Sequence, residues 1–481
     1  MTSLPHDLAV LLPELILAIG GLVLLLLGVM VNNDRGMGAL SFLAVIAFGA
    51  AAYFVINPVT PDASAFAGAF VADGFSRFAK ILILLGAGLT LPMAQGYFVR
   101  EKIVRFEFPV LVVFATLGML LMVSAASFLA LYMGLELQSL SLYVLAAFNR
   151  DSVRSSEAGL KYFVLGALSS GLMLYGISLV YGFTGTTEFS GVAHAIKQSG
   201  VSIGLIFGLV FLISGLAFKV AAVPFHMWTP DVYEGSPTPI TAFFAMAPKI
   251  AAMALFLRAV IEPFPDAVQQ WRQIIVVISI LSMALGAFAA IGQSNIKRLM
   301  AYSSIGHMGY TLLGLAAGST AGIQGVLIYL TIYLVTNAGV FACILAMKRD
   351  GQMVEAIGDL SGLARTQPRL AFALAIMMLS LAGIPPLAGF WAKFYIFLAA
   401  IEAHLYGPAI LGVLASVVGA FYYLRIVKIM YFDEPAPAFD RDMGWSLGTI
   451  VTGASVFTLL FVVGGAPIIA MAETGARALV P

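Results

Sequence analysis

Long apolar stretches recur along the whole chain of 481 residues and constrain its fold more than any other feature. Each comes close to the roughly 20 residues that an α-helix needs to cross the hydrocarbon core of a bilayer. The sequence predicts fourteen such spans, with boundaries good to a few residues: 8–30, 37–56, 72–95, 107–125, 127–148, 158–183, 202–231, 239–261, 273–292, 299–317, 323–347, 370–403, 407–430 and 446–470.

These spans must be helical. Backbone polar groups find no water inside hydrocarbon, so only helices and closed barrels cross a membrane, and the alternating segments of about ten residues that a barrel needs are absent. The composition agrees, because 61% of the residues are hydrophobic and only 10% are charged. An ordinary soluble domain carries about 25% charged residues. The sequence therefore predicts an all-α polytopic membrane protein and excludes a soluble enzyme.

The sequence lacks the residues and motifs that several kinds of cofactor need. The net charge of +1 gives no electrostatic case for binding nucleic acid. The only cysteine, Cys343, excludes an internal disulfide or an iron–sulfur cluster built by this chain alone. Neither a GxxxxGK nor a GxGxxG motif occurs, and no His, Cys and carboxylate cluster has metal-ligand spacing. We expect any redox or nucleotide cofactor to lie on other chains.

Basic residues concentrate in alternate loops, which predicts an orientation. One set of loops holds fourteen of them: Arg35, Arg100, Lys102, Arg105, Arg150, Arg154, Lys297, Arg298, Lys348, Arg349, Arg365, Arg369, Lys428 and Arg441. The opposite set, which includes both termini, holds Lys197, Arg272 and Arg477. By the positive-inside rule, both termini are expected on the periplasmic side of a bacterial inner membrane. The leader MTSLPHD lacks Lys and Arg, so we expect no cleaved signal peptide.

Basic side chains near the ends of spans have a simple explanation. Arg77 and Lys80 lie close to Asp73, and Arg258 and Arg425 lie within about a turn of a predicted helix end. Long basic side chains reach the interface from such positions. We expect local pairing or snorkelling for these four residues.

Charges further inside the spans need another explanation. Glu136 is central in 127–148, and Lys249 follows Pro248 near the middle of 239–261. A charge at the centre of a membrane helix costs about 2.5–3.5 kcal/mol, so such residues are functional candidates. Lys161 lies only about a turn inside its span, where snorkelling is a strong alternative.

Two further lysines lie in unusually long apolar stretches that contain helix breakers. Pro224 follows Lys219 in the span 202–231, and four breakers precede Lys393 in the span 370–403: Gly383, Pro385, Pro386 and Gly389. Proline removes a backbone donor, so both helices are expected to break. Broken helices at matching positions of two halves indicate an ion path. Independent proline kinks remain the alternative.

The spacing of these breaks predicts a domain organisation. Residues 107–261 and 262–430 would form two five-helix repeats, and the odd number of helices requires the second to be inverted. Residues 1–106 would form three N-terminal helices, and 431–481 would hold the last helix.

The buried groups suit proton transfer. If Lys219 were paired with Glu136 it would hold its proton, and separation of the pair would release the proton toward Lys249. His226 and His307 titrate near neutrality and are candidate relays through water. A hydrogen-bonded structural role explains His307 equally well.

Four motifs resemble one family. Residues 223–239, VPFHMWTPDVYEGSPTP, resemble a signature of the antiporter-like membrane subunits of respiratory complex I, the proton-pumping NADH:quinone oxidoreductase. The segments APK at 247–249, SSIGHMG at 303–309 and GIPPLAGF at 383–390 fit the same family. The lysine in 370–403 differs from the glutamate usual in M-type subunits, and the long C-terminal lateral helix of L-type subunits is not seen.

The resemblance, rather than spacing, implies the roles of these residues. Glu136 and Lys219 would be a functional pair, Lys249 the central relay and Lys393 the residue toward the periplasmic exit, with Lys161 modulating the pair. FMN, iron–sulfur clusters, NADH and quinone would bind to partner subunits. The neighbours would be an antiporter-like subunit M and a small K-type subunit, with the peripheral arm reached through them.

Two other functions fit the same sequence. A subunit of a multi-subunit cation/proton antiporter or of a membrane-bound hydrogenase would carry similar lysines. A passive scaffold would use the buried charges only to fix the register of its helices.

Overall fold

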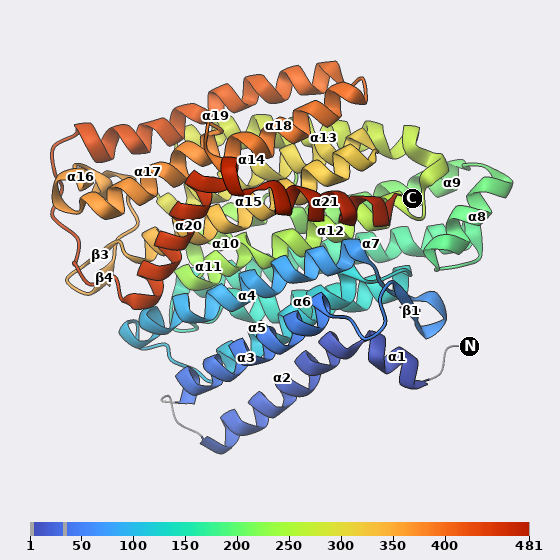
Figure 1. Ribbon diagram of the computed structural model, residues 1–481, viewed down its shortest axis with the longest axis horizontal. Coiled ribbons are helices and arrows are strands. Elements are labelled where there is room, and N and C mark those ends of the chain that lie inside the picture. Colours follow the sequence, from blue (N-terminus) through green and yellow to red (C-terminus); the bar gives the residue numbers. More distant parts are fainter. Residues whose placement is uncertain (1–3, 32–35, 481) are drawn as a thin grey trace.

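The computed structural model describes residues 4–31 and 36–480, and every statement below concerns those residues. They form a bundle of helices that run side by side (Figure 1). The helices of the first half are α1 (Leu4–Val10), α2 (Leu12–Val31), α3 (Gly36–Ile56), α4 (Gly74–Arg100), α5 (Glu107–Val123), α6 (Phe128–Ala146), α7 (Val153–Thr184), α8 (Phe189–Ser199), α9 (Ile203–Val220), α10 (Trp228–Gly235), α11 (Thr238–Ala245) and α12 (Ala247–Ile261).

The second half continues in the same way. Its helices are α13 (Val268–Ile291), α14 (Ile296–Ala317), α15 (Thr320–Leu345), α16 (Leu363–Thr366), α17 (Pro368–Ala382), α18 (Ala388–Glu402), α19 (Tyr406–Phe432), α20 (Trp445–Gly464) and α21 (Ala466–Leu479). Two antiparallel hairpins pair β1 (Ala63–Ala65) with β2 (Phe70–Ala72), and β3 (Lys348–Arg349) with β4 (Gln352–Met353). Three 3-10 turns are η1 (Phe66–Gly68), η2 (Pro265–Ala267) and η3 (Ile357–Leu360).

The predicted all-helical membrane fold is confirmed. Eleven described segments are long and apolar enough to cross a membrane. The other three predicted spans correspond to the shorter α5, to α14 and to the pair α17 and α18. The last predicted span differs, because the chain bends at Gly465 and α21 continues to Leu479. The amphipathic α8 and both hairpins were not predicted.

Both expected helix breaks are present, and each begins with the same kind of cap. The helix α9 ends at Val220 and α17 ends at Ala382, and the next residue in each case is left-handed: Ala221 at φ 61° and Gly383 at φ 89°. A left-handed residue turns the chain out of the helix, and its N–H bonds carbonyls of the last turn, whereas the carbonyl of the final helical residue stays open to another partner. A third break, which the sequence analysis did not predict, separates α11 from α12 at Met246.

Glycines bring two helix pairs into backbone contact. A Cβ atom at Gly118 of α5 would lie 2.5 Å from the Gln138 nitrogen of α6, and one at Gly286 of α13 would lie 2.5 Å from the Gly306 nitrogen of α14. Helices in lipid gain stability mainly from such close packing, because lipid is as apolar as their side chains. The pairs α5–α6 and α13–α14 occupy corresponding places in the two predicted repeats.

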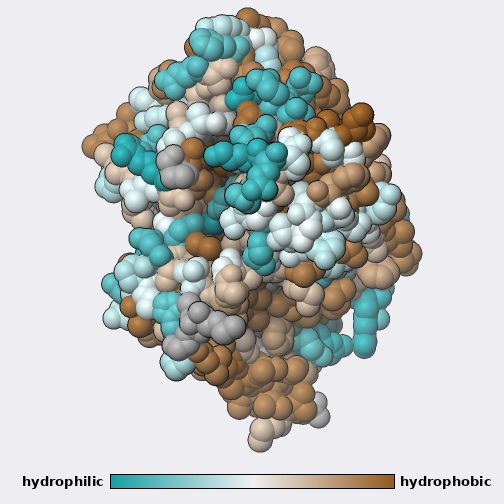
Figure 2. Space-filling view, turned by 90° about the vertical axis from the view of Figure 1, so that its right-hand side faces the viewer, coloured by the Kyte–Doolittle hydropathy of each residue, from teal (hydrophilic) through white to brown (hydrophobic). Residues whose placement is uncertain are grey.

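The two ends of the bundle differ in charge. Both ends of the described chain lie at the same end of the bundle (Figure 1), which we call the terminal end. The opposite end carries β3, β4 and α16 with basic residues such as Lys348 and Arg349, and we call it the basic end. Figure 2 faces the terminal end and shows hydrophilic residues across it, with hydrophobic residues at its margins and lower tip. Arg35, counted in the sequence analysis, lies outside the described residues.

Near the terminal end, Arg258 is buried rather than snorkelling. Its guanidinium lies 2.7 Å from Asp73 Oδ2 and 2.6 Å from Glu262 Oε1, and its side chain is 1% exposed. Burial acts to raise the pKa of Asp73, but Arg258 and the Ser76 N–H outweigh it and hold this pKa below its usual range. Burial raises the pKa of Glu262 despite the same arginine. This ion triad ties the start of α4 to the end of α12.

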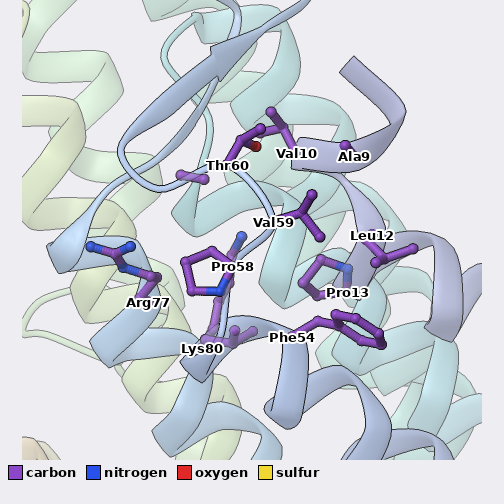
Figure 3. Close-up of a pocket in the computed structure, with 12 residues that line it drawn as sticks. Ala9, Val10, Leu12, Pro13, Phe54, Pro58, Val59, Thr60, Arg77 and Lys80 are labelled. Carbon is purple, nitrogen blue, oxygen red and sulfur yellow. The ribbon is translucent and has the colours of Figure 1, made fainter. Parts of the chain in front are cut away.

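Lys80 also has a partner other than the one expected. Its ammonium lies 2.7 Å from Glu14 Oε1 of α2 rather than beside Asp73, and both side chains are buried. Figure 3 shows Lys80 and Arg77 beside a pocket whose other walls include Leu12 and Pro13. Local pairing was therefore the correct expectation for Lys80, but the partner comes from a helix far away in the sequence.

Candidate proton path: buried lysines at the helix breaks

Lys219 is held by hydroxyl groups from two other helices. It is the second-last residue of α9 and only 9% exposed. Its ammonium donates to Ser139 Oγ of α6 at 3.0 Å and to Ser170 Oγ of α7 at 3.4 Å. Neither serine was a candidate from the sequence, because only the packing of α6, α7 and α9 brings them to this lysine.

Glu136 does not contact Lys219 directly, contrary to the pairing considered from the sequence. Among the described residues, no ion pair within 4.0 Å joins the two side chains, and Glu136 acts on Lys219 through its charge alone. One carboxylate oxygen of Glu136, Oε1, is buried without a hydrogen-bond partner in the described chain. Ser139, about one turn further along α6, accepts a hydrogen bond from the ammonium instead.

Lys249 reaches the open end of the first half-helix. It is 1% exposed, and its ammonium donates to the Val220 carbonyl at 2.9 Å and lies 5.3 Å from the Trp228 ring centre. Val220 is the last residue of α9, where the helix dipole favours a positive charge. Lys249 itself lies in the first turn of α12, where the dipole opposes one. The two dipoles therefore act on this ammonium in opposite directions.

Lys393 repeats this arrangement at the second break. It is 8% exposed, and its ammonium donates to the Ala382 carbonyl at 2.9 Å and to Ser416 Oγ of α19 at 2.8 Å. Ala382 is the last residue of α17, as Val220 is of α9. Both lysines thus use a backbone carbonyl that a broken helix leaves free.

His307 is fully enclosed between tyrosines of other helices. Its Nδ1 lies 2.5 Å from the Tyr329 hydroxyl, and its Nε2 lies 2.9 Å from the Tyr423 hydroxyl. Both ring nitrogens therefore have partners, as expected for a buried polar group.

His226 and Lys161 are less buried than the three lysines at the helix breaks. His226 is half-buried in the break between α9 and α10, and no interaction described for this chain joins its ring to a lysine. Lys161 is 42% exposed and pairs with Glu157 at 2.7 Å and with Asp231 at 2.8 Å. Snorkelling with local pairing explains Lys161, and its link to the path is Asp231, on the second half of the broken helix.

Two cavities, each large enough for several water molecules, open at the basic end next to α10. One of about 370 Å³ is lined by residues that include Arg154, Ser236 and Lys297. Glu355, on its wall, pairs with Lys297 at 2.8 Å. Burial acts to raise the pKa of Glu355, but Lys297 and Asn295 outweigh it and hold this pKa below its usual range. A smaller cavity of about 130 Å³ contains Lys161.

The ammonium groups of Lys219, Lys249 and Lys393 each donate hydrogen bonds to neutral carbonyl or hydroxyl oxygens. Within the described residues, no group of three or more His, Cys, Asp and Glu side chains could hold a metal ion. A row of buried lysines at broken helices is an arrangement for proton or small-cation transfer. The chain is therefore a polytopic membrane protein of the ion-translocating class.

Comparison with known proteins refines this class. A family model described as NADH:quinone oxidoreductase/Mrp antiporter, TM, matches residues 125–419. The NADH-quinone oxidoreductase subunit N of Parvibaculum lavamentivorans is 58% identical over 474 residues, which cover 98% of this chain and 97% of the relative. The chain therefore belongs to the NADH:quinone oxidoreductase/Mrp antiporter membrane-subunit family and, within it, to the subunits N of NADH-quinone oxidoreductase.

Solved structures agree with this assignment. A chain of respiratory complex I from Thermus thermophilus is 34% identical with a TM-score of 0.81, and the match covers 96% of this chain and 99% of that chain. A chain of the Mrp complex from Dietzia sp. DQ12-45-1b has a TM-score of 0.83 at 24% identity, over 98% and 97% of the two chains. The second match shows a shared fold alone. The family resemblance of the sequence motifs is confirmed.

Proposed function

We propose that this membrane subunit of proton-translocating NADH:quinone oxidoreductase moves protons along Lys219, Lys249 and Lys393. The observation that supports the proposal is that each ammonium group donates its hydrogen bonds to uncharged acceptors. Each is buried, and each is held by serine hydroxyls or by a carbonyl at the end of a broken helix. A carboxylate in contact would fix the proton in place, whereas neutral acceptors let it leave.

Glu136 has the role of a modulator in this proposal. Its charge acts on Lys219 across Ser139, and one of its oxygens has no partner in the described chain. A small shift of α6 relative to α9 would change the distance between the two charges and so the affinity of Lys219 for its proton.

The path is built on two inverted repeats, 107–261 and 262–430. Two observations support this division. Each unit begins with a helix pair in glycine contact, α5–α6 and α13–α14, and each has its fourth span broken after a left-handed residue. Independent proline kinks would not require both features to recur in the same order.

The basic end faces the cytoplasm, and both termini face the periplasm. The distribution of lysine and arginine supports this orientation. Protons then enter through the cavities beside α10, where Lys161, Asp231 and Glu355 line the walls. They leave toward the terminal end from Lys393.

Other subunits cover two features of the surface. Glu136 is half-buried on a face of α6 that also exposes Leu129 and Met133, and the second break exposes Pro385 and Pro386. A carboxylate and an irregular backbone are tolerated at membrane depth only against protein or water. The partners are the neighbouring subunit M, the small K-type subunit and, through them, the peripheral arm. FMN, iron–sulfur clusters and the NADH and quinone sites lie on partner subunits.

The test uses the intact complex that contains this chain. In proteoliposomes, NADH oxidation and proton uptake are measured for the wild type, for Lys249→Ala and for Lys197→Ala, a control that removes an exposed lysine of α8. We expect Lys249→Ala to assemble with its flavin and clusters and to lose about a hundredfold or more in proton uptake, the low end for loss of a proton-transfer group. An assembled Lys249→Ala complex that pumps like the control would refute the proposal, and loss of assembly alone would favour a scaffold.

A further inference from the structure

The second half of the first broken helix, α10, has no continuous helical connection to α9. Residues 221–227 separate the two helices, and α10 itself has only eight residues. A helix of this length is not stable by itself, so neighbouring elements must hold it in place. The contacts of α10 therefore decide where its residues lie, among them Asp231 on the wall of the cavity of about 130 Å³.

Contacts with α7, in the same unit, hold α10 from one direction. A Cβ atom at Gly235 would lie 2.7 Å from the Arg154 carbonyl oxygen, so the two backbones touch there. Ion pairs join the helices as well. Asp231 Oδ2 lies 2.8 Å from the Lys161 ammonium, and Glu234 Oε1 lies 2.9 Å from Arg154 Nη2.

The first turn of α14, in the second unit, also grips α10. Arg298 Nη1 lies 2.7 Å from Asp231 Oδ1 and 3.0 Å from Glu234 Oε2. The neighbouring Lys297 donates to the carbonyl of Ser236, the C-cap residue of α10, at 3.0 Å. A helix dipole disfavours cations at the N-terminus, so α14 gains nothing from two of them in its first turn. The carboxylates and the last carbonyl of α10 stabilise them there.

Both carboxylates of α10 divide their oxygens between the two units. Asp231 and Glu234 each place one oxygen on a basic residue of α7 and the other on Arg298. Among the residues that the structure describes, Arg298 is the only partner of these two carboxylates from the second unit. A single exposed pair contributes little, but a network of several charges restricts geometry. Because α14 also packs against α18, which carries Lys393, the network connects α10 to the second unit.

We propose that Arg298 is a positioning residue that holds Asp231, and through it Lys161, at the proton entrance of the first unit. This inference rests on the proposed function. Arg298 moves no proton itself. It occupies Asp231 Oδ1, so that only Oδ2 is bound to the Lys161 ammonium. Without Arg298, α7 alone holds these carboxylates, and Asp231 is free to turn both oxygens toward Lys161.

The test compares arginine variants in the intact complex. Arg298→Gln removes the cation from both carboxylates, whereas Arg298→Lys keeps it, and a single nitrogen makes both contacts. Arg365→Gln is the matched control, because it removes another arginine of the basic end, whose pair with Glu434 lies at the surface. NADH-driven proton uptake is measured in proteoliposomes, with flavin and cluster content as the measure of assembly.

We expect Arg298→Gln to assemble, since pairs as exposed as these add little to stability. Its proton uptake should fall about fivefold or more, the low end for coupling between two sites. Arg298→Lys should recover most of this loss, and Arg365→Gln should stay within about twofold of the wild type. Uptake by Arg298→Gln equal to that of Arg365→Gln would overturn the proposal, as would a loss that Arg298→Lys does not relieve. If Arg298→Gln fails to assemble, Arg298→Met replaces it.

A double variant tests whether Arg298 acts through Asp231. Asp231→Asn alone should reduce proton uptake, because it removes the carboxylate that Arg298 positions. Adding Arg298→Gln should then lower uptake by less than about twofold further, since residues that act through one another are not additive. Losses that multiply in the double variant would show independent roles and would contradict the proposal.

A thiol on α10 reports its position independently of pumping. Val232 is buried on this helix, and Val232→Cys is combined with Arg298→Gln or with Arg365→Gln. We expect a membrane-permeant maleimide to label the first combination at least about fivefold faster, because α10 is no longer held by α14. Equal labelling rates would show that α10 does not depend on Arg298. The native Cys343 is buried and gives the background.

The outcomes separate this inference from the function on which it rests. If Lys249→Ala stops pumping but Arg298→Gln pumps and labels like its control, the positioning role is refuted and the lysine path stands. If Lys249→Ala pumps normally, the proposed function fails, and the labelling of α10 alone decides whether Arg298 positions this helix.

Discussion

At the scale of single residues, three buried lysines combine a costly buried charge with hydrogen bonds to uncharged oxygen atoms. Lys219, Lys249 and Lys393 each keep their head group in a place where a full charge is costly. Hydroxyls and open carbonyls reduce that cost without neutralising the charge. The buried Arg258, by contrast, contacts two carboxylates and is fixed as an ion. Neutral oxygen atoms thus hold the buried lysines, whereas carboxylates hold the buried arginine.

The serine beside Lys219 can be tested by removing one oxygen. Ser139→Ala takes away the closest acceptor of this ammonium, and a hydrogen bond to a charged group is worth about 1.5–3 kcal/mol. We expect proton uptake by the complex to fall about tenfold or more with assembly unchanged. Ser141→Ala is the control, since this serine of the same helix bonds the Leu137 carbonyl instead. Equal behaviour of the two variants would remove Ser139 from the path.

The ion triad predicts a loss of stability. Asp73→Asn keeps a good N-cap for α4 but removes the charge that faces Arg258, and breaking a buried pair costs about 3–5 kcal/mol. We expect a lower melting temperature of the detergent-solubilised complex. Asp62→Asn is the control, because its pair with Arg77 lies at the surface and contributes at most about 1 kcal/mol. A melting temperature equal to that of the control would show that the triad is not stabilising.

The same aspartate predicts a pH dependence. Because the folded-state pKa of Asp73 is below its usual value, its contribution is present at neutral pH and is lost as the pH falls through the folded pKa, below about 4. The difference in melting temperature between the wild type and Asp73→Asn should therefore shrink on acidification. A difference that grows at low pH would contradict the sign of this shift.

At the scale of helices, close contact and interruption are produced by a few residues. Gly118 and Gly286 let backbones touch, and the left-handed Ala221 and Gly383 end the half-helices. The two breaks could be predicted, because proline and glycine interrupt a helix in any environment. The break at Met246 was not predicted, although Pro248 follows it by two residues and gives the same kind of signal.

Helix contact can be tested with one added methyl group. Gly118→Ala would bring a Cβ atom to 2.5 Å from the Gln138 backbone, so α5 and α6 must separate. We expect a destabilisation of about 1–3 kcal/mol, as for overpacking of a core, and less assembled complex in the membrane. Gly171→Ala, where a Cβ meets open space, should assemble at the wild-type level. Normal assembly of Gly118→Ala would show that this contact is loose.

At the scale of the whole molecule, the proposed direction of transport rests on the basic residues at one end of the bundle and on the buried lysines between the two ends. The β3–β4 hairpin and α16 lie at one end of the bundle, and both ends of the described chain lie at the other (Figure 1). The Lys80–Glu14 pair joins α2 to α4, and the Asp73–Arg258 pair joins the start of α4 to α12.

The orientation can be tested by labelling. Gln198→Cys places a thiol at the terminal end and Glu434→Cys places one at the basic end, and both positions are exposed. A membrane-impermeant maleimide added to intact cells should label only Gln198→Cys, and both should be labelled after lysis. The native Cys343 is buried and serves as the unlabelled background. Labelling of Glu434→Cys in intact cells would reverse the orientation.

The sequence by itself determined that this chain spans a membrane many times, that two of its helices break and which charges lie too deep for water. Hydrocarbon imposes these properties on each segment separately, through length, apolarity and the chemistry of proline. Only the tertiary structure decided what each charge meets. Ser139 instead of Glu136 beside Lys219, Glu14 beside Lys80 and the tyrosines around His307 come from helices distant in sequence. Partners of this kind depend on how helices rotate and pack against one another, and no local pattern records that geometry.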